Sequence, residues 1–240
     1  MEWEEQNLII RDYLGPKFRD NNITTKIIIW DHNFDMDYYP MNILNDAETR
    51  KFVAGTGWHG YGGTASAIDK VQAVHPDKDV YFTEQSGGGW NSDLDTYRMG
   101  TMFYYMEHFV MATVNRGSKN FIMWNLALDS NHGPTTTTGG CQDCRGLVTI
   151  RDDGSYYRNL EYYLIGHFSK AVRLNAKRVK NSANNMPSRL LVSSFMNEDG
   201  SKALVVMNRT GQAQNYTIRC ANRRVNYTHP NEAVVTFKFK

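Results

Sequence analysis

Four short apolar runs, separated by segments of helical periodicity, constrain the fold of this 240-residue chain most strongly. The runs lie at residues 26–30, 55–58, 80–83 and 121–124. Such continuous runs, without polar alternation, are typical of strands buried on both faces of a parallel sheet. The segments 45–53, 64–75 and 94–115 predict helices that cover the sheet, and residues 2–18 predict a first helix that stops at Gly15-Pro16.

The pattern changes after residue 128. A long loop rich in glycine and threonine leads to a helical turn at 161–172. Short alternating runs follow at 189–196, 202–209, 215–220 and 233–240, divided by turn residues, which indicates an antiparallel meander. We therefore predict an α/β domain over residues 1–170 and an antiparallel β unit over residues 171–240.

Composition excludes several classes of function. The formal net charge is +2, and the lysines and arginines are spread along the chain, so we expect no nucleic-acid partner. No apolar run approaches the roughly 20 residues of a membrane span, and the acidic, amphipathic first residues do not resemble a signal peptide. Nothing in the sequence calls for a cofactor.

The cysteines and the glycosylation sequons give weaker signals. Cys141 and Cys144 form a C-x-x-C pair without a second ligand pair, so we expect a local disulfide or two packed thiols and no metal. Cys220 is predicted to be a buried free thiol. Four Asn-x-Thr sequons, three of them within twenty residues, favour a parent protein that is secreted or lysosomal; they start at Asn22, Asn208, Asn215 and Asn226.

Polar and aromatic side chains follow each apolar run, where the strands should end. They are Asp31, His59, Tyr61, Glu84, Trp124 and Asn125. Each one alone could be a core, capping or loop residue. Because the carboxyl ends of parallel strands meet at one edge, the whole set predicts a polar, aromatic cleft suited to sugar binding and acid–base chemistry.

Several longer motifs resemble glycoside hydrolase family 30, and within it the glucosylceramidase-like branch. They are VYFTEQSGG, WNLALDSNHGP, GGCQDCRGLVTI and EYYLIGHFSKAV. The resemblance implies the C-terminal half of a (β/α)₈ barrel, strands five to eight, followed by part of a β-sandwich. It also implies retaining hydrolysis of a β-glucoside or a glycosphingolipid.

The resemblance assigns roles to the residues at the strand ends. Glu84 matches the nucleophile, and the glycines after it would leave room for a sugar ring. His59 and Tyr61 match residues that flank the nucleophile, with the Tyr61 hydroxyl expected to hydrogen-bond its carboxylate. Trp124 matches a wall of the sugar subsite, and Asp31 and Asn125 are further candidates for substrate binding. Gly60 stands where the family often has a bulky residue, so the shape of the aglycone side does not carry over. Gln85 and Ser86 also differ from some members of the family, so the preference for the leaving group does not carry over either.

One catalytic element of the family has no counterpart. The general acid/base lies in an Asn-Glu-Pro motif, which does not occur in this sequence and would belong upstream of Met1 together with barrel strands one to four. We expect little hydrolysis from this chain alone. Three hypotheses about the function stay open: the chain is the C-terminal portion of a glycosidase, a catalytically inactive sugar-binding protein, or a structural half-barrel.

Overall fold

The computed structural model of the protein describes residues 1–88 and 101–240. Two compact units are present: Met1–Gln85 with Ala112–Trp124, and Ser86–Met111 with Asn125–Lys240. No helix in the described residues is long and apolar enough to cross a membrane.

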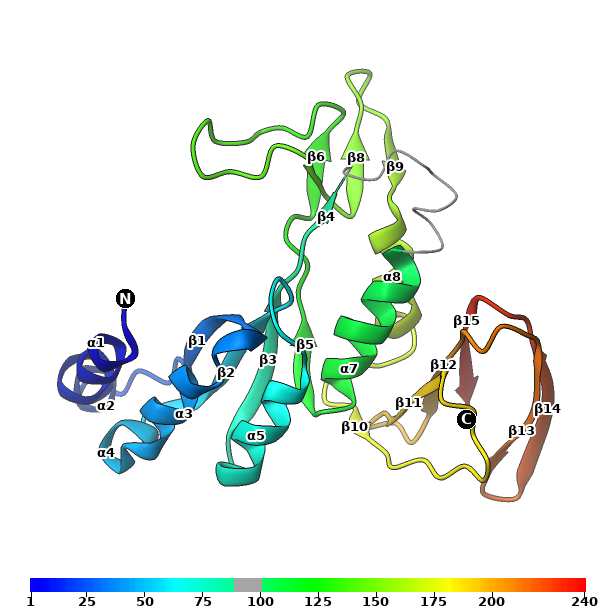
Figure 1. Cartoon of the computed structure of the whole chain (residues 1–240), viewed down its shortest axis with the longest axis horizontal. Helices are drawn as coiled ribbons and strands as arrows, with labels where there is room; N and C mark the ends of the chain where they lie inside the picture. The colour runs from blue at the N-terminus through cyan, green and yellow to red at the C-terminus, as the bar shows by residue number, and fades with distance from the viewer. Residues whose placement is uncertain (89–100) are drawn as a thin grey trace. The chain divides into compact units, whose positions relative to one another are not determined.

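The first unit is built on a parallel four-stranded sheet, as the sequence predicts (Figure 1). Its strands, in spatial order, are β1 (Ile27–Asn33), β2 (Val53–His59), β3 (Asp79–Glu84) and β5 (Ser118–Phe121). The side chains that face the core include Ile29, Trp58 and Phe82, all with no exposed surface. The ring of Phe82 stacks on that of Phe121 at 4.6 Å.

The fourth strand lies three residues earlier than we predicted, at 118–121 instead of 121–124. A register shift separates the Val80–Ser118 pair from the Phe82–Phe121 pair, and the side-chain oxygen of Asn120 accepts from the Phe82 N–H at 2.9 Å. A side-chain oxygen thus replaces a backbone carbonyl as the hydrogen-bond acceptor at this point of the ladder. The apolar run at 121–124 begins only at the last residue of this strand, because the strand consists mostly of polar residues.

The first helix does not stop at Gly15-Pro16. It runs through α1 (Trp3–Leu8), the π-helical turn η1 (Ile9–Leu14) and α2 (Gly15–Asp20). Pro16 directly follows the π-helical turn, as the second residue of α2, so the helix continues through a residue that often ends one. A Cβ at Gly15 would lie 2.3 Å from the ring of Phe52, so this glycine permits close packing.

The remaining helices of the first unit largely follow the prediction. Helix α4 (Ala47–Arg50) is capped by Asp46, whose carboxylate accepts from two backbone N–H groups, and α5 (Ser66–Val74) confirms the predicted 64–75 segment. A hydrogen bond from Asn7 lowers the pKa of Asp46 to about 2. Helix α3 (Tyr38–Asn45) was missed because Pro40 resembles a helix breaker, yet Pro40 sits in its first turn. Helices α3 and α5 lie on the same face of the sheet (Figure 1).

Of the predicted helix 94–115, residues 101–114 are helical and end in η3 (Met106–Val110) and α7 (Met111–Val114). Residues 94–100 lie outside the described part of the chain. The second unit also contains α8 (Leu160–Ser169), which is longer than the single turn predicted there.

Two small sheets precede the β unit. One pairs β4 (Gly87–Gly88) with β7 (Cys144–Arg145), and the other joins β6 (Ala127–Asp129), β8 (Val148–Ile150) and β9 (Tyr156–Arg158). Cys141 and Cys144 form the expected disulfide. Cys220 is a free thiol, as predicted, but it is half-exposed because it ends a strand of the outer hairpin.

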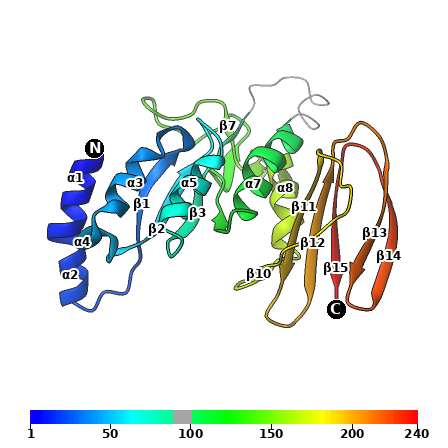
Figure 2. The same ribbon diagram turned by 60° about the horizontal axis from the view of Figure 1, so that its bottom comes forward.

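The antiparallel unit is confirmed (Figure 2). One sheet contains β10 (Lys177–Arg178), β11 (Leu190–Met196), β12 (Lys202–Asn208) and β15 (Ala233–Phe239). Beside it lies a hairpin of β13 (Gln214–Cys220) and β14 (Arg223–His229). Strand β14 was missed because most of its side chains are exposed, so it shows little apolar alternation.

The hairpin gives the clustered sequons a structural role. Asn215 pairs with Thr228 and Asn226 with Thr217 across the strands, through side-chain hydrogen bonds of 2.6 and 2.8 Å. The central residues of both tripeptides, Tyr216 and Tyr227, contact the His229 ring. Asn208 is fully buried, and its amide nitrogen donates to three backbone carbonyls.

His229 is held in its neutral form. It has no exposed surface, accepts from the Tyr216 hydroxyl at 2.7 Å and lies 3.0 Å from the Ala233 carbonyl. A carbonyl only accepts, so Nε2 carries the hydrogen and Nδ1 is the acceptor. Burial lowers the pKa of His229 and raises that of Tyr216 to about 12.

This arrangement predicts a loss of stability in acid. Below pH 6.5, the usual pKa of histidine, His229 takes up a proton in the unfolded chain. In the folded protein its pKa is lower, so it stays neutral there. The free energy of unfolding should therefore fall as the pH drops below 6.5, by up to about 1.4 kcal/mol per pH unit. Guanidinium denaturation between pH 8 and pH 5 measures the slope. Because burial also lowers the pKa values of His75 and His167, the informative quantity is the difference from His229→Gln, whose slope should be shallower.

Candidate active site

The site begins with a bulge in β1. Trp30 and Asp31 have φ angles of 77° and 61°, in the left-handed region that non-glycine residues rarely adopt. The pairing of β1 with β2 skips Asp31, since Trp30 faces Gly57 and His32 faces Trp58. The bulge is maintained by hydrogen bonds to Trp30: its backbone N–H donates to the Gln6 side chain and its indole N–H to the Asn33 carbonyl.

The bulge directs Asp31 toward the neighbouring strands. Its Oδ1 lies 3.0 Å from Nε2 of His59, the last residue of β2, and accepts from the Thr83 hydroxyl at 2.7 Å. An ionised carboxylate can only accept, so Nε2 of His59 carries the hydrogen. Asp31 therefore fixes the orientation of the His59 ring.

His59 lies between two acidic side chains. Its Nδ1 lies 3.9 Å from Oε1 of Glu84, the last residue of β3, a separation too long for a hydrogen bond. The His59 side chain is only 11% exposed, whereas those of Asp31 and Glu84 are 65% and 32% exposed. A mostly buried imidazole thus lies between two carboxylates that reach solvent, at the ends of parallel strands.

The aromatic candidates lie just beyond the strands. The ring of Tyr61 meets the His59 ring edge-on at 6.1 Å, and its backbone N–H donates to Asn33 at 3.2 Å. The N–H of Trp124 donates to the Gln85 carbonyl at 2.8 Å, beside the end of β3. Both rings are about half-exposed, which leaves surface for a ligand. The hydrogen bond from the Tyr61 hydroxyl to Glu84 stays a prediction.

Asn125 belongs to the second unit. Its φ angle is 82°, and its carbonyl accepts from Leu147 at 3.2 Å. These contacts assign it a backbone role, and its expected part in substrate binding stays a prediction.

Sequence reasoning missed Thr83 and misread one glycine. Thr83 adjoins Glu84 and was taken as part of the strand, because nothing in the sequence shows that its hydroxyl meets Asp31. We expected the glycines after Glu84 to make room for a sugar. At Gly87 the room is taken by the chain itself, since a Cβ there would lie 2.2 Å from Oε1 of Glu161.

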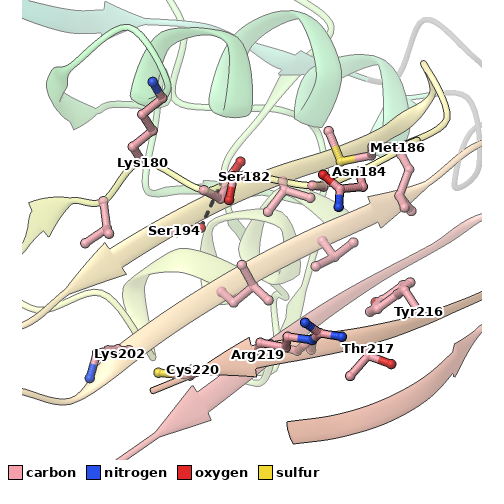
Figure 3. A pocket seen from close by; sticks show the side chains of 18 of the residues that line it. Lys180, Ser182, Asn184, Met186, Ser194, Lys202, Tyr216, Thr217, Arg219 and Cys220 are labelled. Carbon is pink, nitrogen blue, oxygen red and sulfur yellow. Dashed lines mark hydrogen bonds between the residues drawn. The ribbon is translucent and has the colours of Figure 1, made fainter. Parts of the chain in front are cut away.

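A pocket with a volume of about 840 Å³ lies inside the antiparallel unit, apart from these candidate residues (Figure 3). Its lining combines apolar residues of β11 and β12, such as Val192 and Leu204, with the basic side chains of Lys180, Lys202 and Arg219. The described residues around it include no Asp or Glu, so it lacks the groups needed for acid–base cleavage of a glycoside. Across residues 1–88 and 101–240, no cluster of three His, Cys, Asp or Glu side chains suits a metal ion.

The chain belongs to glycoside hydrolase family 30. The model of the family's TIM-barrel domain matches residues 2–172, and the model of its β-sandwich domain matches residues 175–237. These matches confirm the family and the fold class, a barrel portion followed by a sandwich portion.

Similar proteins within the family act on more than one substrate. An endo-1,6-β-D-glucanase of Aspergillus fumigatus is 27% identical, over 97% of this chain and 46% of its own length. The lysosomal acid glucosylceramidase of Mus musculus is 25% identical, over 89% of this chain and 42% of its own. A solved endo-β1,6-glucanase superposes with a TM-score of 0.91 at 33% identity, over 99% of this chain and 53% of that one. The chain therefore spans about half the length of the relatives it matches.

The packing around Asp31 predicts that a methyl group added at Gly57 lowers the stability of the protein. A Cβ at Gly57 would lie 3.2 Å from the Thr83 hydroxyl and 3.3 Å from Oδ1 of Asp31. The Thr83 hydroxyl donates a hydrogen bond to Oδ1 of Asp31, so neither oxygen can move away from the new methyl group without stretching that hydrogen bond. Gly57→Ala should lower the free energy of unfolding by about 1–3 kcal/mol. Thermal denaturation of the purified chain measures the loss.

Gly166→Ala is the matched control, because Gly166 lies within α8 and a Cβ there would meet no atom within 4 Å. It should be neutral or stabilising. Equal destabilisation by both changes would show that the contact between Asp31 and Thr83 does not restrict the site.

Proposed function

We propose that this chain carries the nucleophile side of a retaining β-glycosidase, with Glu84 as the nucleophile. The observation that carries the proposal is the cluster in which Asp31 holds His59 beside Glu84 at the ends of parallel strands. Membership of family 30, whose members are glycoside hydrolases, supports the same reaction class.

The proposed chemistry proceeds in two displacements. A Glu84 carboxylate oxygen attacks the anomeric carbon, the bond to the leaving oxygen breaks, and a covalent glycosyl ester forms. Water then attacks the same carbon from the opposite side, which frees the carboxylate and retains the β configuration. Tyr61 and Trp124 are the exposed rings that would contact the sugar, and the strand end fixes Glu84 for attack.

The sequence also suggests which catalytic step is weak in this chain. A poor leaving group needs a proton from a second carboxylic acid, about 5–5.5 Å from the nucleophile in retaining enzymes. The sequence contains no Asn-Glu-Pro motif that could supply it. We therefore propose that a longer parent protein provides the acid, and that this chain alone cleaves only activated glycosides.

The relatives favour a particular kind of bond. Endo-1,6-β-glucanases and glucosylceramidases both occur among the proteins similar to this chain. In a β-1,6-glucan and in glucosylceramide alike, the glucose is attached to an oxygen on a primary carbon. We propose that the substrate is a β-glucosyl unit on a primary alcohol. The higher identities of the glucanases favour the glucan, and a glycosphingolipid is the second candidate.

An activated substrate tests the nucleophile in the chain as it is. With 2,4-dinitrophenyl β-glucoside the leaving group needs no proton, so dinitrophenolate should be released and Glu84 glycosylated. Azide needs no general base, and it should attack the anomeric carbon to give β-glucosyl azide. Adding azide should raise turnover by about 10²-fold or more, within the roughly 10²–10⁴-fold range of acid–base catalysis. Dinitrophenolate absorbance and product stereochemistry are the readouts.

Two variants complete the experiment. Glu84→Gln should abolish both the release of dinitrophenolate and the azide product, whereas Glu48→Gln, at an exposed surface position, should change neither. Sugar binding without any labelled Glu84 would instead support the inactive sugar-binding protein. Full hydrolysis of an unactivated β-glucoside by the chain alone would contradict the missing acid.

Competition tests the proposed linkage. A β-1,6-linked gluco-oligosaccharide should slow the labelling of Glu84 at lower concentration than β-1,4- or β-1,3-linked ones of equal length. Only the first places a flexible primary carbon next to the cleaved bond. Mass spectrometry of the labelled peptide gives the rates. Equal competition by all three oligosaccharides would refute the primary-alcohol preference.

A further inference from the structure

The chain passes from the first unit to the second directly after Gln85, and the segment that follows is held by contacts within the second unit. Strand β4 begins three residues after Glu84 and consists of Gly87 and Gly88, both buried. Its partner within the sheet is β7, where Gly87 faces Arg145 and Gly88 faces Cys144. The Ser86 carbonyl, just before β4, accepts from the Tyr105 hydroxyl at 2.6 Å. Because the two glycines have no side chains to pack, their own position depends on backbone contacts, among them the pairing with β7.

A buried ion pair holds one residue of β7. Arg145 donates to Glu161 of α8 through two nitrogens, at 3.1 and 2.8 Å, in the fork geometry that fixes both groups. The Glu161 side chain is only 2% exposed. Its Oε1 would lie 2.2 Å from a Cβ at position 87, so the carboxylate packs directly against the backbone of β4.

A disulfide holds the other residue. Cys144 is buried and bonded to Cys141, whereas Cys141 is exposed. The Cys144 carbonyl also accepts from Nδ1 of His132 at 2.9 Å. The cross-link restricts the backbone of β7 at the residue that faces Gly88, and a thiol can approach the disulfide from the side of the exposed residue Cys141.

We infer that the Cys141–Cys144 disulfide and the Arg145–Glu161 ion pair act together as a clamp on β4, which positions the chain following Glu84. Glu161 is therefore a positioning residue: its buried carboxylate, occupied by Arg145, cannot reach a substrate. The inference rests on the proposed function only for the consequence at Glu84. The clamp itself can be measured without any reaction.

Reduction by a dithiol opens the clamp at one side. The dithiol is oxidised to its cyclic disulfide, and Cys141 and Cys144 become thiols. Hydrogen exchange of the amides of β4 and β7 should then accelerate about tenfold or more, with near-UV circular dichroism confirming that the chain stays folded. Labelling of Glu84 by dinitrophenyl β-glucoside should slow about tenfold in its rate constant and change less in its half-saturating concentration. A purely structural loss would lower the active fraction and leave both constants unchanged.

Matched variants separate the causes. A Cys141→Ser, Cys144→Ser double variant should behave like the reduced protein and no longer respond to reductant, and reoxidation should restore only the wild type. Cys220→Ser removes the free thiol and should change nothing. Arg145→Lys keeps the charge but loses the fork, and should give an intermediate acceleration of exchange.

Each outcome decides the proposal. Unchanged exchange at β4 after reduction overturns the clamp. Faster exchange with unchanged labelling overturns its effect on Glu84. If the oxidised wild type shows no labelling at all, the proposed function has failed, and the exchange data alone confirm or reject the clamp.

Discussion

The site depends on the bulge that turns Asp31 out of the first parallel strand. Without it, the pairing of β1 and β2 would remain in register and Asp31 would not be the unpaired residue. With it, one carboxylate oxygen of Asp31 accepts from both Thr83 and His59. Three strands are thereby joined at their carboxyl ends, and the His59 ring is oriented toward Glu84 by groups outside its own strand.

The backbone strain at this point is informative. A tryptophan and an aspartate in the left-handed region cost free energy, and such residues persist only where their surroundings hold them. Here the surroundings are hydrogen bonds to Trp30 and the contact of its ring with Tyr39, 4.5 Å between centroids. Strain of this kind gathers at functional sites, which agrees with placing the candidate site here.

Glycines shape both units through close approach. Gly57 makes room for the Asp31–Thr83 contact, and Gly87 makes room for the buried Glu161 carboxylate. At Gly55 a Cβ would lie 2.1 Å from the Asp79 carbonyl oxygen. The glycines that follow Glu84 can therefore serve the packing of the protein itself, even where a bound sugar offers an equally simple explanation.

The sequence by itself determined the class of fold, the direction of the first sheet, the antiparallel unit and the residues at the strand ends. It could do so because burial imposes a periodicity on each element, and because parallel strands end at a common edge. Only the tertiary structure decided that Asp31 reaches His59, that Thr83 joins them and that Gly87 serves Glu161. It also decided that β5 starts at Ser118, since the Asn120 side chain replaces a ladder carbonyl. Each of these depends on contacts between side chains that are distant in the sequence, and local periodicity carries no information about such contacts.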